Sequence, residues 1–126
     1  ALDLLQVERI DHGNRALEAP ALVRRIAEEG LTLTVCPLSN LRLCVIADMA
    51  HSPVARMLEQ GLKATINSDD PAYFGGYVND NYRAVAAALG LSAAQIVQLA
   101  ENSFTGSFLP PQDVARHLAA VREAAR

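Results

Sequence analysis

The sequence has only two cysteines, Cys36 and Cys44, and their spacing matches no metal-binding motif. A reducing, cytoplasmic setting is the simplest interpretation, with Cys36 as a buried strand residue. The net charge of −3 gives no electrostatic reason to expect nucleic acid or an anionic membrane as a partner. No apolar run approaches the roughly 20 residues that a membrane span needs. Nucleic-acid-binding and membrane-spanning functions are therefore not expected.

The sequence also lacks an initiator methionine, a visible signal peptide, an internal repeat and a linker. It begins abruptly with Ala1-Leu2-Asp3-Leu4-Leu5, which is typical of the last turn of a helix. We expect a fragment or processed product, so a missing targeting signal means little. What is present is enough for one small domain, because 51% of the 126 residues are hydrophobic.

Three short apolar runs alternate with helical segments, which predicts parallel strands joined by helices. The expected strands are 7–11, 31–36 and 62–66. The expected helices are 19–29, 53–60 with Ser52 as N-cap, 77–89, 92–103 and 112–125. Three strands cannot close a barrel, which needs eight βα units and roughly 250 residues. We therefore expect residues 1–126 to form the C-terminal part of a single (β/α)₈ barrel domain: an α/β fold of about three βα units plus C-terminal helices.

The stretch Asn67-Ser68-Asp69-Asp70-Pro71 places two adjacent carboxylates where an apolar run ends. Side chains alternate along a strand, so both carboxylates can address one site only if the strand has already ended. Paired carboxylates at the C-terminal end of a strand suit metal ligation and proton handling. An ordinary Asp-Asp-Pro turn is the alternative interpretation.

Other polar residues also fall at predicted strand ends, where parallel α/β folds place their active sites. His12 follows the first strand, and Ser39 and Asn40 follow the second in an expected loop. A structural histidine and a simple turn are the alternatives for these positions. Tyr73, Phe74 and Tyr77 are expected in the core rather than on a base-stacking surface.

Several separated motifs support a more specific interpretation. They are Arg9-Ile10-Asp11-His12-Gly13, Cys36-Pro37-Leu38-Ser39-Asn40, Ser68-Asp69-Asp70-Pro71 and Asn102-Ser103-Phe104. Their order and rough spacing resemble the adenosine/adenine deaminase family of metal-dependent amidohydrolases across essentially the whole chain. The run from Asp69 to Tyr77 is most similar to the adenine deaminase branch.

The resemblance implies a Zn²⁺-dependent barrel that hydrolyses the 6-amino group of a purine, most simply adenine to hypoxanthine and ammonia. Asp69 matches the metal-ligating aspartate, and Asp70 matches the carboxylate that contacts the purine and the attacking hydroxide. His12 matches the histidine that activates this hydroxide and is not itself a zinc ligand. Ser39 and Asn40 are candidate substrate contacts.

The family's His-x-His pair, its further metal histidine and its proton-shuttling glutamate are absent from these residues. Catalytic zinc sites supply at least three protein ligands, so we expect the chain alone neither to bind zinc specifically nor to deaminate. Three alternatives remain open. In the first, the substrate is adenosine or another 6-aminopurine. In the second, the chain is an inactive, self-associating fragment. In the third, an N-terminal fragment of the same protein is its partner.

Overall fold

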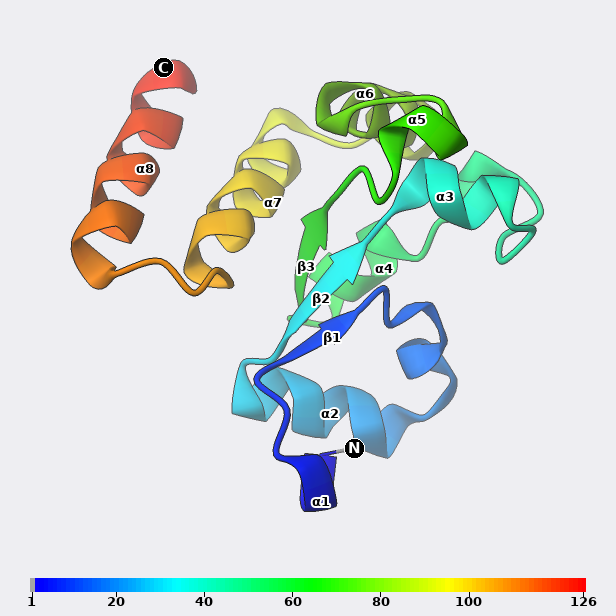
Figure 1. Ribbon diagram of the computed structural model, residues 1–126, viewed down its shortest axis with the longest axis horizontal. Helices are drawn as coiled ribbons and strands as arrows, with labels where there is room; N and C mark the ends of the chain where they lie inside the picture. The colour runs from blue at the N-terminus through cyan, green and yellow to red at the C-terminus, as the bar shows by residue number, and fades with distance from the viewer. Residues whose placement is uncertain (1) are drawn as a thin grey trace.

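A three-stranded parallel sheet organises the chain, with its strands in the order β1-β2-β3 (Figure 1). The structure, a computed structural model, describes residues 2–126. The strands are β1 (Arg9–Asp11), β2 (Thr32–Val35) and β3 (Lys63–Ile66). The helices are α1 (Leu2–Leu5), η1 (Asn14–Glu18), α2 (Pro20–Glu29), α3 (Pro37–Arg42), η2 (Met49–His51), α4 (Val54–Glu59), α5 (Pro71–Phe74), α6 (Val78–Leu89), α7 (Ala93–Thr105) and α8 (Pro111–Ala124).

One face of the sheet is apolar and forms the core. The register pairs Leu33 of β2 with Ile10 on one side and with Ala64 on the other. Val35 and Ile66 form the next pair, and each is at most 2% exposed. Residues from the surrounding helices complete this core: Val23, Ile26, Val54, Met57, Val85 and Leu99. The apolar face therefore supplies most of the free energy of burial that holds strands and helices together.

The opposite face of the same sheet is polar, because side chains alternate along each strand. The Thr34 hydroxyl donates to Asp11 Oδ1 at 3.0 Å across the β1–β2 pair. The Thr65 hydroxyl donates to the Leu33 carbonyl at 3.3 Å and accepts from Asn67 Nδ2 at 2.8 Å. A sheet covered by helices on both faces would be apolar on both. This polar face is typical of a barrel interior that leads to a site.

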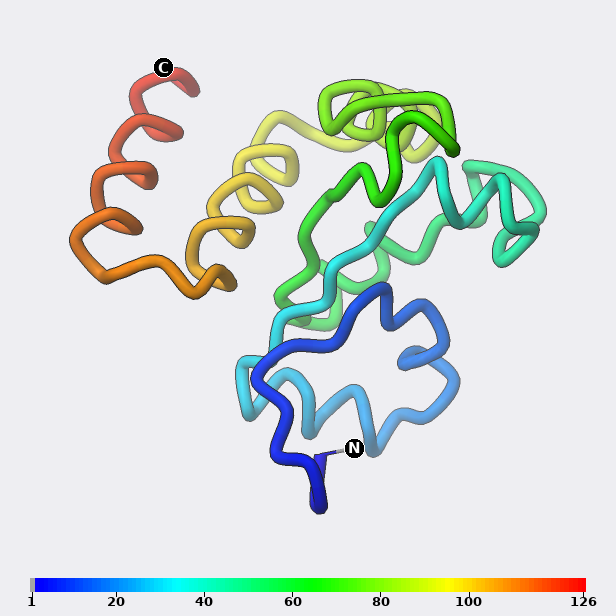
Figure 2. Tube along the Cα trace, viewed as in Figure 1, coloured from blue at the N-terminus to red at the C-terminus, as the bar shows by residue number. Residues whose placement is uncertain are grey.

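Helices lie at both the edge and the C-terminal end of the sheet (Figures 1 and 2). α3, α5 and α6 gather beyond the strand tips, whereas α7 packs along β3. Asn102 of α7 donates from Nδ2 to the Ala64 carbonyl at 2.8 Å, and Glu101 pairs with Arg122 of α8 at 2.7 Å. Across residues 2–126, no helix combines the length and apolar character that crossing a bilayer requires.

The α/β class and the order of strands and helices are confirmed, with small differences at element ends. Two details are wrong. Ser39 and Asn40 lie in helix α3 rather than in a loop, because Pro37 occupies the first helical turn, where proline is favoured. Ser52 does not cap α4: Pro53 is the N-cap, and the buried Ser52 hydroxyl has no hydrogen-bond partner within the described chain.

The expected burial of two aromatic residues is also wrong. Tyr73 is 71% exposed and Tyr77 is 73% exposed. Both belong to the segment around α5, which lies beyond the strand tips and not against the apolar face of the sheet (Figure 1). Aromatic character alone does not show whether such residues pack against the sheet or lie beyond the ends of its strands.

Candidate active site

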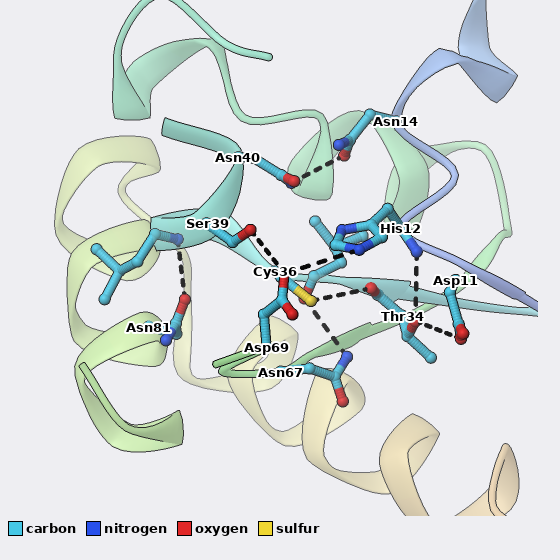
Figure 3. A network of polar contacts seen from close by, with 12 residues as sticks. Asp11, His12, Asn14, Thr34, Cys36, Ser39, Asn40, Asn67, Asp69 and Asn81 are labelled. Atoms are coloured by element: carbon cyan, nitrogen blue, oxygen red, sulfur yellow. Dashed lines mark hydrogen bonds and ion pairs between the residues drawn. The ribbon is translucent and has the colours of Figure 1, made fainter. Parts of the chain in front are cut away.

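Three side chains that follow the three strands converge beyond the polar face of the sheet (Figure 3). His12 follows β1, Cys36 follows β2 and Asp69 lies beyond β3. His12 Nε2 lies 3.8 Å from Asp69 Oδ2, and the ligand atoms of all three residues lie within 4.8 Å of one another. The carboxyl ends of parallel strands meet at one edge, so residues 57 positions apart in the sequence share one site.

His12 is held by its backbone at the end of β1. Its φ of 60° is in the left-handed region, which is uncommon for a residue other than glycine. Its N–H donates to the Thr34 carbonyl at 3.1 Å and lies 3.3 Å from the Thr34 hydroxyl. The next residue, Gly13, has a φ of 72°, and a Cβ there would lie 2.8 Å from Leu33 Cδ2. A larger residue at Gly13 would therefore strain the backbone of the turn that presents His12 and push against the Leu33 side chain.

Asp69 is positioned by a chain of contacts that begins in α6. Asn81 of α6 is fully buried and accepts from the Leu38 backbone N–H at 2.9 Å. The neighbouring Ser39, also fully buried, donates from its hydroxyl to Asp69 Oδ2 at 2.7 Å. Gly76 permits this docking, since a Cβ there would lie 2.5 Å from Leu38 Cδ1. The Asp69 carboxylate, 33% exposed, thus has a fixed orientation toward His12.

The neighbouring carboxylate has different contacts. Asp70 is the N-cap of α5, and its Oδ1 accepts from the Tyr73 N–H at 3.1 Å. It is exposed, and it is not among the residues that line the depression around His12 and Asp69. β3 ends at Ile66, so the strand has stopped before both carboxylates, as a site shared by Asp69 and Asp70 requires. The two side chains nevertheless have different hydrogen-bond partners. The catalytic role of Asp70 stays a prediction.

Asn40 links two segments of the chain. Its Nδ2 donates to Asn14 Oδ1 at 3.1 Å, and its carbonyl accepts from the Val45 N–H at 2.9 Å. Asn40 is 2% exposed. These contacts join the turn after His12 to α3, which is a structural role; its substrate contact stays a prediction.

Cys36 is the third member of the cluster, although the sequence predicts only a buried strand residue at this position. It is 5% exposed, and its thiol donates to the Thr34 carbonyl at 3.4 Å. Burial, followed by the charges of Asp69 and Asp11, raises the pKa of this thiol to about 11. Its position in the sequence is the signal that indicates a site residue, because Cys36 lies at the end of a predicted strand just as His12 does. Imidazole nitrogen, thiolate sulfur and carboxylate oxygen are all zinc donors, so the cluster fits that ion in kind.

Comparison with known proteins agrees with this geometry. The family model described as adenosine deaminase matches residues 1–124. The chain is 67% identical over 121 residues to an adenine deaminase of Sphingopyxis alaskensis, covering 96% of the chain and 36% of that protein. It is 60% identical over 121 residues to an adenine deaminase of Caulobacter vibrioides, covering 96% of the chain and 35% of that protein. The chain thus spans about a third of the length of these relatives.

Solved structures show the same arrangement. An adenine deaminase from Arthrobacter aurescens superposes with a TM-score of 0.96 at 47% identity, covering 98% of this chain and 38% of that one. An amidohydrolase from Burkholderia ambifaria with bound Zn superposes with a TM-score of 0.88 at 29% identity, covering 99% and 35% of the two chains. These likenesses confirm that the three strands and their helices form part of a (β/α)₈ barrel.

Proposed function

The chain belongs to the adenosine deaminase family, and we propose that it forms the C-terminal part of an enzyme that hydrolytically deaminates adenine to hypoxanthine and ammonia. Three relatives named adenine deaminase, at 67%, 60% and 58% identity, support the free base as substrate. The observation that carries the proposal is the Asp69 carboxylate, held by Ser39 and facing His12 at 3.8 Å. An imidazole and a carboxylate are thereby held close together at the carboxyl ends of the strands.

Each residue at these strand ends has a proposed role. Asp69 would hold Zn²⁺, and its hydrogen bond from Ser39 leaves the other carboxylate oxygen available. When bound, the ion provides a nucleophile from water at neutral pH. His12 accepts a proton at Nε2 and stabilises negative charge that develops at C6 of the purine. Asp70 would contact the purine ring, with its backbone fixed by the N-cap contact to α5.

A chimera tests this function. This chain replaces the matching 121-residue segment of the Sphingopyxis alaskensis protein, and adenine deamination is measured by steady-state kinetics. The chimera should deaminate adenine, and D69N should abolish the activity. The matched control D113N removes a carboxylate from α8 and should leave activity unchanged. A folded chimera without adenine deamination, or a fully active D69N, would contradict the proposal.

Adenosine is the second candidate substrate, and the matching family model, described as adenosine deaminase, favours it. The same chimera decides between the two, because kcat/KM for adenine and for adenosine can be compared directly. A higher kcat/KM for adenosine would replace adenine as the assigned substrate. Other 6-aminopurines can be ranked in the same assay.

The 126-residue chain by itself is proposed to be inactive, because it spans only about a third of its relatives. An N-terminal fragment of the same protein or a second copy would cover the open edge of β1. Size-exclusion chromatography with light scattering measures self-association, and an adenine assay on the isolated chain measures activity. We place the protein in the cytoplasm because Cys36 and Cys44 are both free thiols.

A further inference from the structure

A series of contacts on the polar face of the sheet joins the start of β1 to His12. Arg9 Nε lies 3.5 Å from Asp11 Oδ1, and the Thr34 hydroxyl donates to the same oxygen at 3.0 Å. The His12 N–H in turn donates to the Thr34 hydroxyl at 3.3 Å (Figure 3). Arg9 and Asp11 share this face because they are two positions apart on β1, and Asp11 is paired in register with Thr34.

Each member of this series orients the next. A hydroxyl has a single proton, and Thr34 gives it to Asp11, so the hydroxyl lone pairs are left for the His12 N–H. Among residues 2–126, Arg9 is the one cation paired with Asp11, and this pair holds the carboxylate where it accepts the Thr34 proton. His12 needs such support, because its φ of 60° is a conformation that residues other than glycine keep only when their surroundings hold them there.

An aromatic ring from the turn between α7 and α8 holds the first member of the series. Arg9 Cζ lies 4.8 Å from the centroid of the Phe108 ring, which is the geometry of a cation–π contact. Phe108 is 69% exposed, so burial in the core does not account for where its ring lies. The guanidinium of Arg9 therefore has two partners, the carboxylate of Asp11 and the face of the ring.

The turn is fixed on β3 and β2 before it reaches β1. Asn102 donates from its side chain to the Ala64 carbonyl of β3 at 2.8 Å, and its own carbonyl accepts from the Gly106 N–H at 2.8 Å. Gly106 then packs so closely on β2 that a Cβ there would lie 2.9 Å from Thr32 Cβ. Because Thr32 is paired in register with Arg9, a chain that passes Thr32 reaches Arg9 two residues later.

We propose that Arg9 is a positioning residue for His12 and that the ring of Phe108 holds Arg9 in place. The inference rests on the proposed function, because the proton-accepting role of His12 belongs to that function. Arg9 acts through Asp11 and Thr34, so its loss changes how His12 is presented and not how the purine is bound. The expected signature is a lower kcat with an unchanged KM.

Steady-state kinetics of adenine deamination by the chimera test this proposal. R9M removes the charge but keeps an unbranched side chain, and it should lower kcat about 10–100-fold with KM unchanged, as expected when an active-site group is misplaced. R9K keeps a cation and should recover most of that loss.

The ring is tested in the same assay. F108L should lower kcat about threefold to tenfold, whereas F108Y keeps a ring face and should restore it. The matched control F104L removes a second ring at the same end of the chain, which stacks on His117 with centroids 4.6 Å apart and does not face Arg9. It should leave kcat unchanged even where it lowers the melting temperature.

Two measurements separate positioning from a general loss of stability. The double variant R9M/F108L should have the kcat of R9M alone, because the ring acts through the guanidinium. Amide hydrogen exchange needs no activity: at His12 it should accelerate in R9M and F108L but not in F104L, relative to the Leu33 amide of the core.

These measurements also distinguish this proposal from the proposed function. An inactive, folded chimera with the unaltered chain would contradict the deaminase function, and the exchange of the His12 amide would still decide the role of Arg9. An unchanged exchange rate at His12 in R9M would overturn the positioning role. So would losses of kcat in R9M and F108L that multiply in the double variant, or a loss in F104L equal to that in F108L.

Discussion

The two faces of the sheet are formed by the same short strands but have different roles. On the apolar face, Leu33 and Val35 are completely buried against helices. On the polar face, Thr34 and Thr65 make hydrogen bonds between strands and lead to the cluster at the strand ends. Successive side chains of β2 point to opposite faces, so residues that stabilise the core alternate with residues that lead to the candidate site. Substitutions on one face should change unfolding, and substitutions on the other should change activity.

The largest stability effect is expected for L33A on the apolar face. Leu33 is 0% exposed and central to the core, so its truncation should cost about 2–5 kcal/mol of unfolding free energy. T34V on the opposite face loses the hydroxyl that donates to Asp11 and accepts from the His12 N–H. Asp11 is exposed and the His12 N–H keeps its bond to the Thr34 carbonyl, so the variant should cost under about 1.5 kcal/mol. Urea denaturation of both variants measures the difference; equal losses would contradict the division between the faces.

S39A tests the polar side at the strand ends. The variant removes the hydroxyl that donates to Asp69 Oδ2, so the carboxylate loses its fixed orientation. We expect adenine deamination by the chimera to fall about 10–100-fold, as for other partners of metal ligands. The unfolding free energy should change by only about 1 kcal/mol. If activity were retained while stability collapsed, Ser39 would be a core residue only.

Asp70 can be tested for two tasks at once. D70A removes the N-cap of α5 and should cost about 0.5–2 kcal/mol, whereas D70N keeps a capping side chain and should cost less. Both variants lose the negative charge proposed to contact the purine. If the proposal holds, both lose adenine deamination, while D70A loses more stability than D70N. A fully active D70N would remove Asp70 from the substrate site.

The smallest effect concerns the two thiols. Cys44 is exposed, so iodoacetamide should alkylate it well before Cys36, as mass spectrometry of the intact chain would show. The pKa of Cys36 is raised from 9.0 to about 11, so its stabilising contribution is present below pH 9 and is lost as pH rises toward 11. C36S should therefore flatten the fall in stability above pH 9; an unchanged pH profile would contradict this.

Much of the fold could be predicted, because it depends on local pattern. The three strands follow from short apolar runs that alternate with helical segments, and α2 ends at Glu29, the last residue of the expected helix, with Gly30 after it in the left-handed conformation. The position of Ser39 and Asn40 in a helix was not predicted. The helix α3 that holds them has only 6 residues, which are too few for a helical period to be recognised.

The candidate site could be predicted in part. His12 and Asp69 were identified, and the structure brings them within 3.8 Å. Cys36 and the Ser39–Asp69 hydrogen bond were missed, because they depend on the register of β2 against β3 and on the seating of α3. The sequence also paired Asp69 with Asp70, which the structure separates through the cap of α5.

The sequence by itself determined that polar residues follow each strand and that the strands are parallel, since both depend on periodicity and on where strands stop. Only the tertiary structure decided which of those residues meet. Register between strands, packing of α3 against α6 and left-handed backbone at His12 and Asp69 are set by contacts among distant residues. Asp69 and Asp70 are adjacent in the sequence but therefore have different hydrogen-bond partners. The thiol of Cys36, which follows the middle strand, lies near Asp69.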